Sequence, residues 1–293
     1  MNTKHVVVLG AGFAGLSAVN VLARDPHVRV TLIDRNNYHL FQPLLYQVAI
    51  AGLEAPQIAW PVRAILRRYR NVRFLMGNVD SVDVNDRRVW VDGKVVSYDY
   101  LVVSAGSIAH DYGVPGVREY TIPLKTLEQA MRIRDRVLSA VEEAVRTAHE
   151  LRRHALMTFV VVGGGPTGVE LAGALAELKK HVLKRDYPEL ATEEVRILLL
   201  EAGSRLVAHL SPESSDYTAR TLEQMGVQVM TQSAVSEVTP FGVYLQDGTF
   251  IPSYVVVWTA GVKGVPVPGL PSGRGGRIPT TPELYLPDTP DIY

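Results

Sequence analysis

Two short β-branched runs in the chain each end in closely spaced glycines and are followed by an apolar segment of helical length. The runs lie at residues 6–9 and 160–162. The glycines that follow them are Gly10, Gly12 and Gly15 in the first copy and Gly163, Gly165 and Gly168 in the second. This pattern predicts, twice, a buried strand that leads through a tight turn into a helix.

The two copies belong to a longer internal repeat. The short segment 72–79 resembles 227–234, and the strand-like segment 98–106 resembles 254–261. Identical residues recur at a constant offset of 155 in the pairs Val72/Val227, Ser81/Ser236, Asp92/Asp247, Gly93/Gly248, Ala105/Ala260 and Gly106/Gly261. The repeat predicts an α/β fold of two tandem Rossmann-like dinucleotide-binding domains, each with a β-meander and a last strand that ends in Ala-Gly.

The spacing of the glycines suits the pyrophosphate of a dinucleotide. In such a motif the first glycine permits the tight turn, the second lets the backbone approach phosphate, and the third lets the helix pack on the strand. The positive end of the following helix favours the anion. A single motif of this kind is weak, since a structural turn gives the same letters. Here the motif occurs twice between a predicted strand and a predicted helix, so we predict two dinucleotide sites.

A carboxylate at the end of the next strand is expected to accept hydrogen bonds from the adenosine ribose. Asp34 follows Gly15 by 19 residues, whereas Glu201 follows Gly168 by 33, so an insertion around residues 184–189 should be looped out. The simpler interpretation is that both are surface acids at strand ends. A carboxylate there repels a 2′-phosphate and favours NADH over NADPH, although the nearby Arg205 leaves this preference open.

The segments between the glycine motifs add helices but no metal site. Residues 125–146 have the apolar spacing of a long amphipathic helix, and Ser211-Pro212 begins another that should end near Gly226. His149 and His154 superficially match a zinc pattern, but residues five apart point in different directions on a helix. We therefore predict no metal.

Composition narrows the classes of partner. With 293 residues, about two domains are expected, and the balance of 30 basic against 30 acidic residues gives no reason to expect nucleic acid. The absence of cysteine excludes disulfide and thiolate chemistry within the chain. No run reaches the roughly 18 apolar residues of a membrane span. The N-terminus resembles a signal peptide only superficially, since its apolar run ends in the glycine turn, and we expect a cytoplasmic protein.

At the level of longer motifs, the chain resembles the type II NADH dehydrogenases. The resemblance rests on the first glycine motif with Asp34, on the segment 36–49 with its Phe-Gln-Pro-Leu-Leu-Tyr-Gln sequence, and on Gly-Pro-Thr-Gly-Val-Glu at 165–170. Members of that family are single-chain FAD enzymes that oxidise NADH and reduce quinone at a membrane surface without pumping protons. The resemblance implies a two-dinucleotide-binding flavoprotein fold with FAD and NADH as cofactors.

The resemblance also assigns residues to each cofactor, which the glycine motifs alone do not, because both fit either nucleotide. The residues implied for FAD are Gly10, Gly12, Phe13, Ala14, Gly15, Asp34, Arg35, Pro43, Leu44, Val79, Ala105, Gly106 and Ser107. Those implied for NADH are Gly163, Gly165, Pro166, Thr167, Gly168, Glu201, Ala260 and Gly261. Glu170 is implied as the catalytic carboxylate near the nicotinamide. The alternative is a first-turn glutamate stabilised by the helix dipole.

The resemblance further implies how the chain is divided and where it acts. Residues 1–120 should form the first part of the FAD domain, residues 121–249 the NADH domain, and residues 250–293 an incomplete return to the FAD domain. Family members continue beyond Tyr293 with a Gly-Asp strand, quinone-contacting residues and amphipathic helices. Quinone is thus an expected partner, with peripheral attachment to the cytoplasmic face of the membrane through that later part. A homodimer remains open.

Two other classes of function stay open. A disulfide reductase needs a cysteine pair, which the chain lacks. A ferredoxin or rubredoxin reductase does not, and it remains an alternative. A non-catalytic redox sensor with two nucleotide sites is the other.

Overall fold

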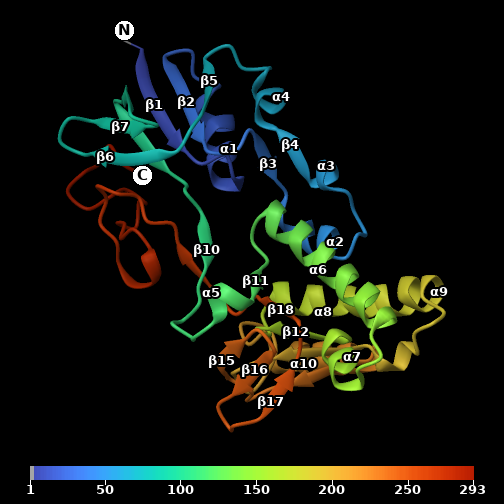
Figure 1. Ribbon diagram of the computed structural model, residues 1–293. Helices are drawn as coiled ribbons and strands as arrows, with labels where there is room; N and C mark the ends of the chain where they lie inside the picture. Colours follow the sequence, from blue (N-terminus) through green and yellow to red (C-terminus); the bar gives the residue numbers. More distant parts are fainter. Residues whose placement is uncertain (1–2) are drawn as a thin grey trace. The chain divides into compact units, whose positions relative to one another are not determined.

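The computed structural model describes residues 3–293, which form two compact units (Figure 1). Of the described residues, unit 1 contains 3–41, Ala59–Ile108 and Val262–Tyr293, and unit 2 contains Gln42–Ile58 and Ala109–Gly261. The chain enters unit 2 earlier than residue 121 and leaves it later than residue 249. The reason is that residues 255–258 form a strand inside the sheet of unit 2, and residues 45–49 form a helix that packs on two other helices of that unit.

Unit 1 is built on a four-stranded parallel sheet in the order β5-β2-β1-β9. The strands are β1 (Lys4–Leu9), β2 (Val28–Asp34), β5 (Val72–Met76) and β9 (Tyr100–Val103). Because side chains alternate along a strand, Val6 and Val8 pack in one core cluster and Val7 and Leu9 in another. The first cluster is completed by helices α1 (Phe13–Leu22) and α4 (Val62–Leu66).

The opposite face of this sheet is covered by an antiparallel meander and by the last part of the chain. The meander consists of β6 (Val79–Asp83), β7 (Arg88–Val91) and β8 (Lys94–Ser97). Asp92 and Gly93 make its tight turn with φ angles of +46° and +73°. The remaining elements of this part of the chain are short: β3 (Tyr38–Leu40) paired with β4 (Ala59–Pro61), β10 (Ser107–Ala109) paired with β19 (Val262–Gly264), and the 3-10 turn Arg274–Gly276.

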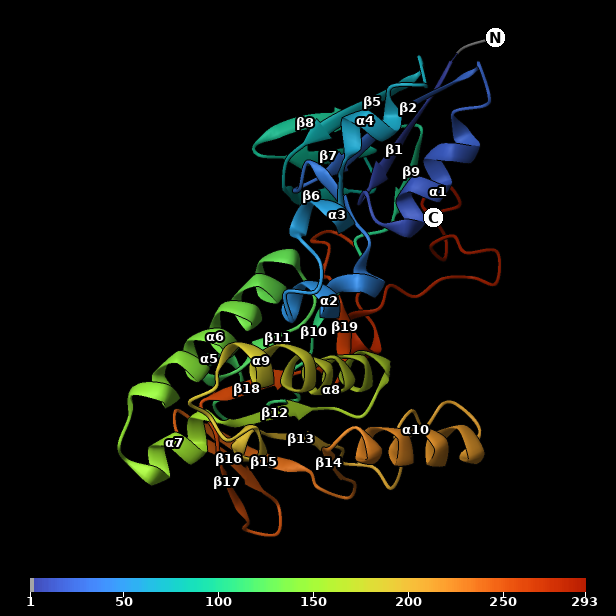
Figure 2. The same cartoon turned by 90° about the vertical axis from the view of Figure 1, so that its right-hand side faces the viewer.

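Unit 2 repeats this plan with one more strand, in the order β11-β18-β12-β13-β14. Its strands are β11 (Ile122–Pro123), β12 (Thr158–Val162), β13 (Arg196–Leu200), β14 (Val227–Met230) and β18 (Val255–Trp258). Figure 2 shows helices α6 (Leu127–Arg146) and α8 (Pro166–Leu178) on one side of the sheet and a meander on the other. The meander is formed by β15 (Val235–Thr239), β16 (Gly242–Leu245) and β17 (Phe250–Pro252). The predicted tandem fold with two meanders is confirmed.

The other helices of unit 2 are shorter, apart from α10 (Pro212–Gln224). They are the 3-10 turn Gln42–Leu44, α2 (Leu45–Ala49), α3 (Ala55–Ile58), α5 (Val117–Tyr120), α7 (Glu150–Leu156), the π-helical turn Lys179–Leu183, α9 (Lys184–Asp186) and the 3-10 turn Thr192–Glu194. The predicted looped-out insertion at 184–189 is therefore wrong in its first part. Helix α8 continues through the π-helical turn into α9, so helix takes up much of the extra length.

The two predicted long helices are present, and each has an N-cap. Helix α6 begins after Thr126, whose side chain accepts the backbone N–H of Gln129 while the Gln129 side chain accepts that of Thr126. Helix α10 begins after Ser211 with proline at its first position, and Gly226 follows its end with a φ of +89°. Across residues 3–293, no helix combines the length and apolarity that a membrane crossing requires.

Candidate dinucleotide-binding sites

The first glycine turn lies between β1 and α1. Gly10 has a φ of +99°, which glycine adopts without strain. The Ser104 hydroxyl lies 3.2 Å from the Gly10 carbonyl oxygen. On the other side of the same peptide unit, the N–H of Ala11 donates to Asp34 Oδ2 at 2.6 Å. The second oxygen of Asp34 accepts the N–H of Asn36 at 2.7 Å, so both carboxylate oxygens are held by the backbone.

The second glycine turn lies between β12 and α8 and has the same contacts. Gly163 has a φ of +111°, and its carbonyl oxygen lies 3.1 Å from Thr259 Oγ1. The N–H of Gly164 donates to Glu201 Oε2 at 2.6 Å. The other Glu201 oxygen accepts the N–H of Gly203 at 2.6 Å. Two turns that are far apart in the sequence are thus held by equivalent groups.

The remaining glycines of each turn separate into two kinds. A Cβ atom on Gly12 or Gly165 would meet nothing within 4 Å. A Cβ atom on Gly15 would overlap the Gly10 carbonyl oxygen, and one on Gly168 would overlap that of Gly163. The second glycine of each motif is therefore not required by the protein's own packing. Because this second glycine has no side chain, an external group has room to approach the backbone.

The helices that follow the turns are suited to an anion. Neither α1 nor α8 has an acidic residue in its first turn or a side-chain cap on its first N–H groups. The first N–H groups of a helix lack intrahelical partners and carry partial positive charge. The residues present therefore fit the pyrophosphate of a dinucleotide in both units.

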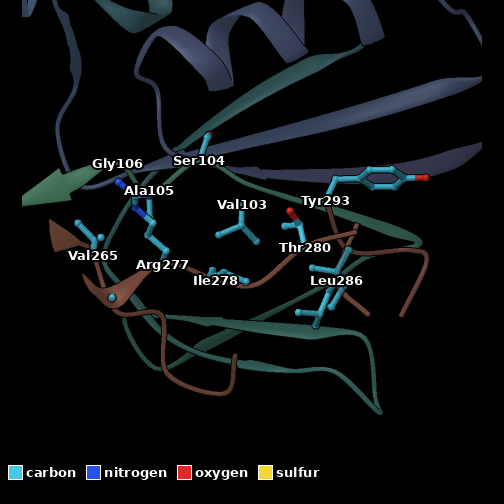
Figure 3. Close-up of a pocket in the computed structure, with 13 residues that line it drawn as sticks. Val103, Ser104, Ala105, Gly106, Val265, Arg277, Ile278, Thr280, Leu286 and Tyr293 are labelled. Atoms are coloured by element: carbon cyan, nitrogen blue, oxygen red, sulfur yellow. The ribbon is translucent and has the colours of Figure 1, made fainter. Parts of the chain in front are cut away.

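Unit 1 also contains a pocket of about 270 Å³ next to the end of β9 (Figure 3). It brings the predicted FAD residues Ala105 and Gly106 together with Ser104. The other lining residues are Val103, Gly264, Val265, Gly276, Arg277, Ile278, Thr280, Leu286, Ile292 and Tyr293. No sequence motif marked the lining residues from Gly264 onward, because they lie in a Pro- and Gly-rich segment without periodicity. Backbone hydrogen bonds of residues 291 and 293 with Leu101 and Val103 bring this segment beside β9.

The structure places the other predicted FAD residues in both units. Phe13 begins α1 with its side chain 49% exposed, and its ring contacts the rings of His39 and Phe41 edge to face. The other members of the set in unit 1 are Ala14 in α1, Arg35 after β2, Val79 in β6 and Ser107 in β10. Pro43 and Leu44 lie in a 3-10 turn that belongs to unit 2.

The predicted NADH residues all belong to unit 2. Pro166 is the first residue of α8, and Thr167 follows it with an exposed side chain. Ala260 and Gly261 follow β18, and the Tyr112 hydroxyl lies close to the space that a Gly261 side chain would occupy.

Glu170 is the fifth residue of α8, and no acidic residue occupies the first turn of that helix. The alternative interpretation of Glu170 as a first-turn acid is therefore wrong. Glu170 is an exposed residue, but its carboxylate is partly desolvated, and this raises the pKa of Glu170 above its usual range. The raised pKa makes Glu170 a candidate functional group.

Sequence reasoning did not single out Ser104 and Thr259 as functional residues. The signal was available, because the constant offset of 155 that relates the two halves also relates these two positions. Histidines of the rejected zinc pattern have other contacts: His149 caps α7, and His154 Nε2 lies 3.0 Å from Arg196 Nη1. Within residues 3–293 there is no cluster of three or more side chains able to hold a metal ion.

The fold and the two turns define a protein with two units of the same architecture, each with a glycine turn suited to a dinucleotide. Many flavoprotein oxidoreductases belong to this class. A family model described as pyridine nucleotide-disulphide oxidoreductase matches residues 4–293. The chain belongs to this family of oxidoreductases. It does so without cysteine, so a thiol pair within these 293 residues is not its electron acceptor.

Proteins of similar sequence narrow the class of oxidoreductase further. The chain is 36% identical over 304 aligned residues to the type II NADH:quinone oxidoreductase Ndh of Mycobacterium tuberculosis, covering 99% of this chain and 65% of that protein. It is 31% identical to an external alternative NAD(P)H-ubiquinone oxidoreductase of Arabidopsis thaliana, covering 99% of this chain and 53% of that protein. The predicted resemblance to type II NADH dehydrogenases is confirmed. The chain spans between about half and two thirds of these relatives' lengths.

Solved structures agree on the fold. The structure of NDH2 from Plasmodium falciparum in complex with NADH superposes with a TM-score of 0.83 at 23% identity, covering 90% of this chain and 56% of that one. The sulfide:quinone oxidoreductase of Aquifex aeolicus superposes with a TM-score of 0.79 at 20% identity, covering 99% and 67%. At these identities, the likeness supports the fold alone.

Proposed function

We propose that this chain binds FAD in unit 1 and NADH in unit 2, and that it oxidises NADH with a quinone as electron acceptor, without pumping protons. The observation that carries the proposal is the duplicated turn, in which Asp34 and Glu201 hold equivalent peptide units in front of a helix without first-turn acids. The Mycobacterium tuberculosis relative, which is a type II NADH:quinone oxidoreductase by name, supports the choice of donor and acceptor.

In this proposal, the chain's own groups bind and orient the two nucleotides. The backbone at Gly12 and Gly165 faces the pyrophosphates, and the carboxylates of Asp34 and Glu201 accept from the ribose hydroxyls. FAD, when bound, supplies a two-electron carrier that the side chains of the chain cannot provide. Glu170, whose pKa is raised, is the carboxyl that we assign to engagement of the nicotinamide substrate.

The experiment is an absorbance titration of the purified chain supplied with FAD. NADH added without oxygen should bleach the flavin absorbance, and a short-chain quinone should restore it. Gly165→Ala should prevent bleaching because its methyl group occupies the phosphate-facing side of the second turn. Lys94→Ala, an exposed change in the meander of unit 1, is the control that should behave like the original chain.

The outcomes separate the alternatives. Restoration by ferredoxin or rubredoxin but not by quinone would support a reductase of small iron proteins. Bleaching that no acceptor reverses would support a redox sensor. A chain that binds neither FAD nor NADH would contradict the proposed function itself.

The solubility of the proposed quinone acceptor also indicates where in the cell the enzyme acts. Respiratory quinones dissolve in the membrane, so we propose peripheral association of the enzyme with the cytoplasmic face of the membrane. Fractionation of cells that express the native protein should recover NADH:quinone activity with membranes and release it on an alkaline wash. Activity that remains in the cytosolic fraction would contradict this extension.

A further inference from the structure

Ser104 and Thr259 occupy equivalent positions, each one residue after the last strand of its parallel sheet in the repeat. The Ser104 hydroxyl lies 2.6 Å from the carbonyl oxygen of Leu9 and 3.2 Å from that of Gly10. The Thr259 hydroxyl lies 2.8 and 3.1 Å from the carbonyl oxygens of the corresponding residues of unit 2. Each hydroxyl therefore donates at the junction of strand and glycine turn.

Each hydroxyl also lies beneath the third glycine of its motif. A Cβ atom on Gly15 would lie 2.7 Å from Ser104 Oγ, and one on Gly168 would lie 2.8 Å from Thr259 Oγ1. The same Cβ atoms would overlap the carbonyl oxygens of the first glycines. The carbonyl of each first glycine is thus turned inward, under the first turn of the helix and against the hydroxyl.

The orientation of this carbonyl decides what the turn presents to an anion. The C=O and N–H groups of neighbouring peptide units alternate in direction, and glycine at a positive φ can change conformation at little cost. An outward carbonyl would place a partial negative charge beside the pyrophosphate, where N–H groups are required. The carboxylates of Asp34 and Glu201 hold only the N–H end of the peptide unit. Each hydroxyl shares its one proton between the nearer strand carbonyl and the C=O end of that peptide unit.

We propose that Ser104 and Thr259 are positioning residues that fix the glycine carbonyls inward and so set the affinity of each turn for its own dinucleotide. The inference rests on the proposed function, because it assumes FAD in unit 1 and NADH in unit 2. When only a fraction of the turns has the binding conformation, the apparent affinity falls by that fraction. Loss of one hydroxyl should therefore weaken one nucleotide and spare the other.

The test compares hydroxyl-free and hydroxyl-retaining variants at each position. Ser104→Ala should raise the Kd for FAD about tenfold, the effect of losing one partly buried hydrogen bond, and leave the Kd for NADH unchanged. Thr259→Val, which keeps the side-chain shape, should do the reverse. Ser104→Thr and Thr259→Ser retain the hydroxyl and should bind both nucleotides as the original chain does. Both constants are measured by calorimetric or fluorescence titration of the 293-residue chain.

A steady-state measurement adds a second readout. Thr259→Val should raise KM for NADH with kcat nearly unchanged, a division that general destabilisation does not produce. Thr259→Ala replaces Thr259→Val if the latter does not fold. Equal weakening of both nucleotides, or a lower melting temperature with unchanged Kd values, would overturn the inference and leave the proposed function standing. An original chain that binds neither nucleotide would overturn both.

Discussion

Glu201 accepts the backbone N–H of Gly164 at 2.6 Å, so the acid at the end of β13 holds the glycine turn that begins after β12. Its second oxygen accepts the N–H of Gly203 at the same distance. A carboxylate has about four acceptor positions, so lone pairs remain for ribose hydroxyls. In the proposed function, this one side chain would both hold the turn and accept from the sugar.

We expect Glu201→Gln to weaken NADH binding about tenfold and to reduce the preference for NADH over NADPH. The amide NH₂ group cannot accept from either backbone N–H, and the charge that repels a 2′-phosphate is lost. The Kd values for both nucleotides measure the effect. Asp34→Asn is the matched control in unit 1 and should leave both values unchanged. An unaltered ratio of the two Kd values would show that Glu201 does not select the cofactor.

The second and third glycines of the first motif should respond differently to alanine. Gly15→Ala places a methyl group against the Gly10 carbonyl and should lower the free energy of unfolding by about 3 kcal/mol. Gly12→Ala meets nothing within 4 Å, so stability should change by less than about 0.5 kcal/mol while FAD binding is lost. Chemical denaturation and FAD titration measure the two effects. Retention of FAD by Gly12→Ala would show that the turn does not contact the pyrophosphate.

The raised pKa of Glu170 predicts a pH-dependent effect on stability. Because desolvation raises the pKa in the folded state above the ordinary 4.5, the ionised carboxylate disfavours folding. The cost is absent below that value and appears as the pH rises through the interval up to the raised pKa. Glu170→Gln should therefore melt at a higher temperature than the original chain at pH 7, and the difference should shrink at pH 4.

Thermal melts of Glu170→Gln and of the exposed control Glu223→Gln at both pH values provide the measurement. The control should show no such trend. A Glu170→Gln difference that is equal at pH 4 and pH 7 would mean that ionisation of Glu170 is not the cause.

The capping box of α6 predicts a local contribution to stability. The Thr126 hydroxyl lies 3.2 Å from the backbone nitrogen of Gln129 and satisfies one N–H that the helix leaves free. Thr126→Ala should lower the free energy of unfolding by about 1 kcal/mol, whereas Thr126→Ser should not. Urea denaturation of both variants tests this, and equal midpoints would show that the cap does not contribute.

Much of the fold could be predicted because its signals are local. The strands before Gly10 and Gly163, the helix that Thr126 caps and the helix that begins after Ser211 each follow from a few neighbouring residues. The internal repeat extended these local signals to the whole chain, since two copies of one pattern are rarely accidental. Family assignment and two dinucleotide turns were within reach of the sequence for the same reason.

Other features depended on contacts between distant residues. Ser104 meets Leu9 across 95 positions, and Thr259 meets Val162 across 97. The unit boundary after Gly261 depends on β18 pairing with β12, not on composition.

The sequence by itself determined the elements, their duplication and the residue types at each turn, because helices, turns and alternation are set by short-range sterics and burial. Only the tertiary structure decided which hydroxyl holds each turn, that Asp34 and Glu201 also hold it through backbone N–H groups, and which residues line the pocket beside β9. Those relationships arise when parallel strands bring their carboxyl ends to one edge, and no local pattern records which side chains meet there.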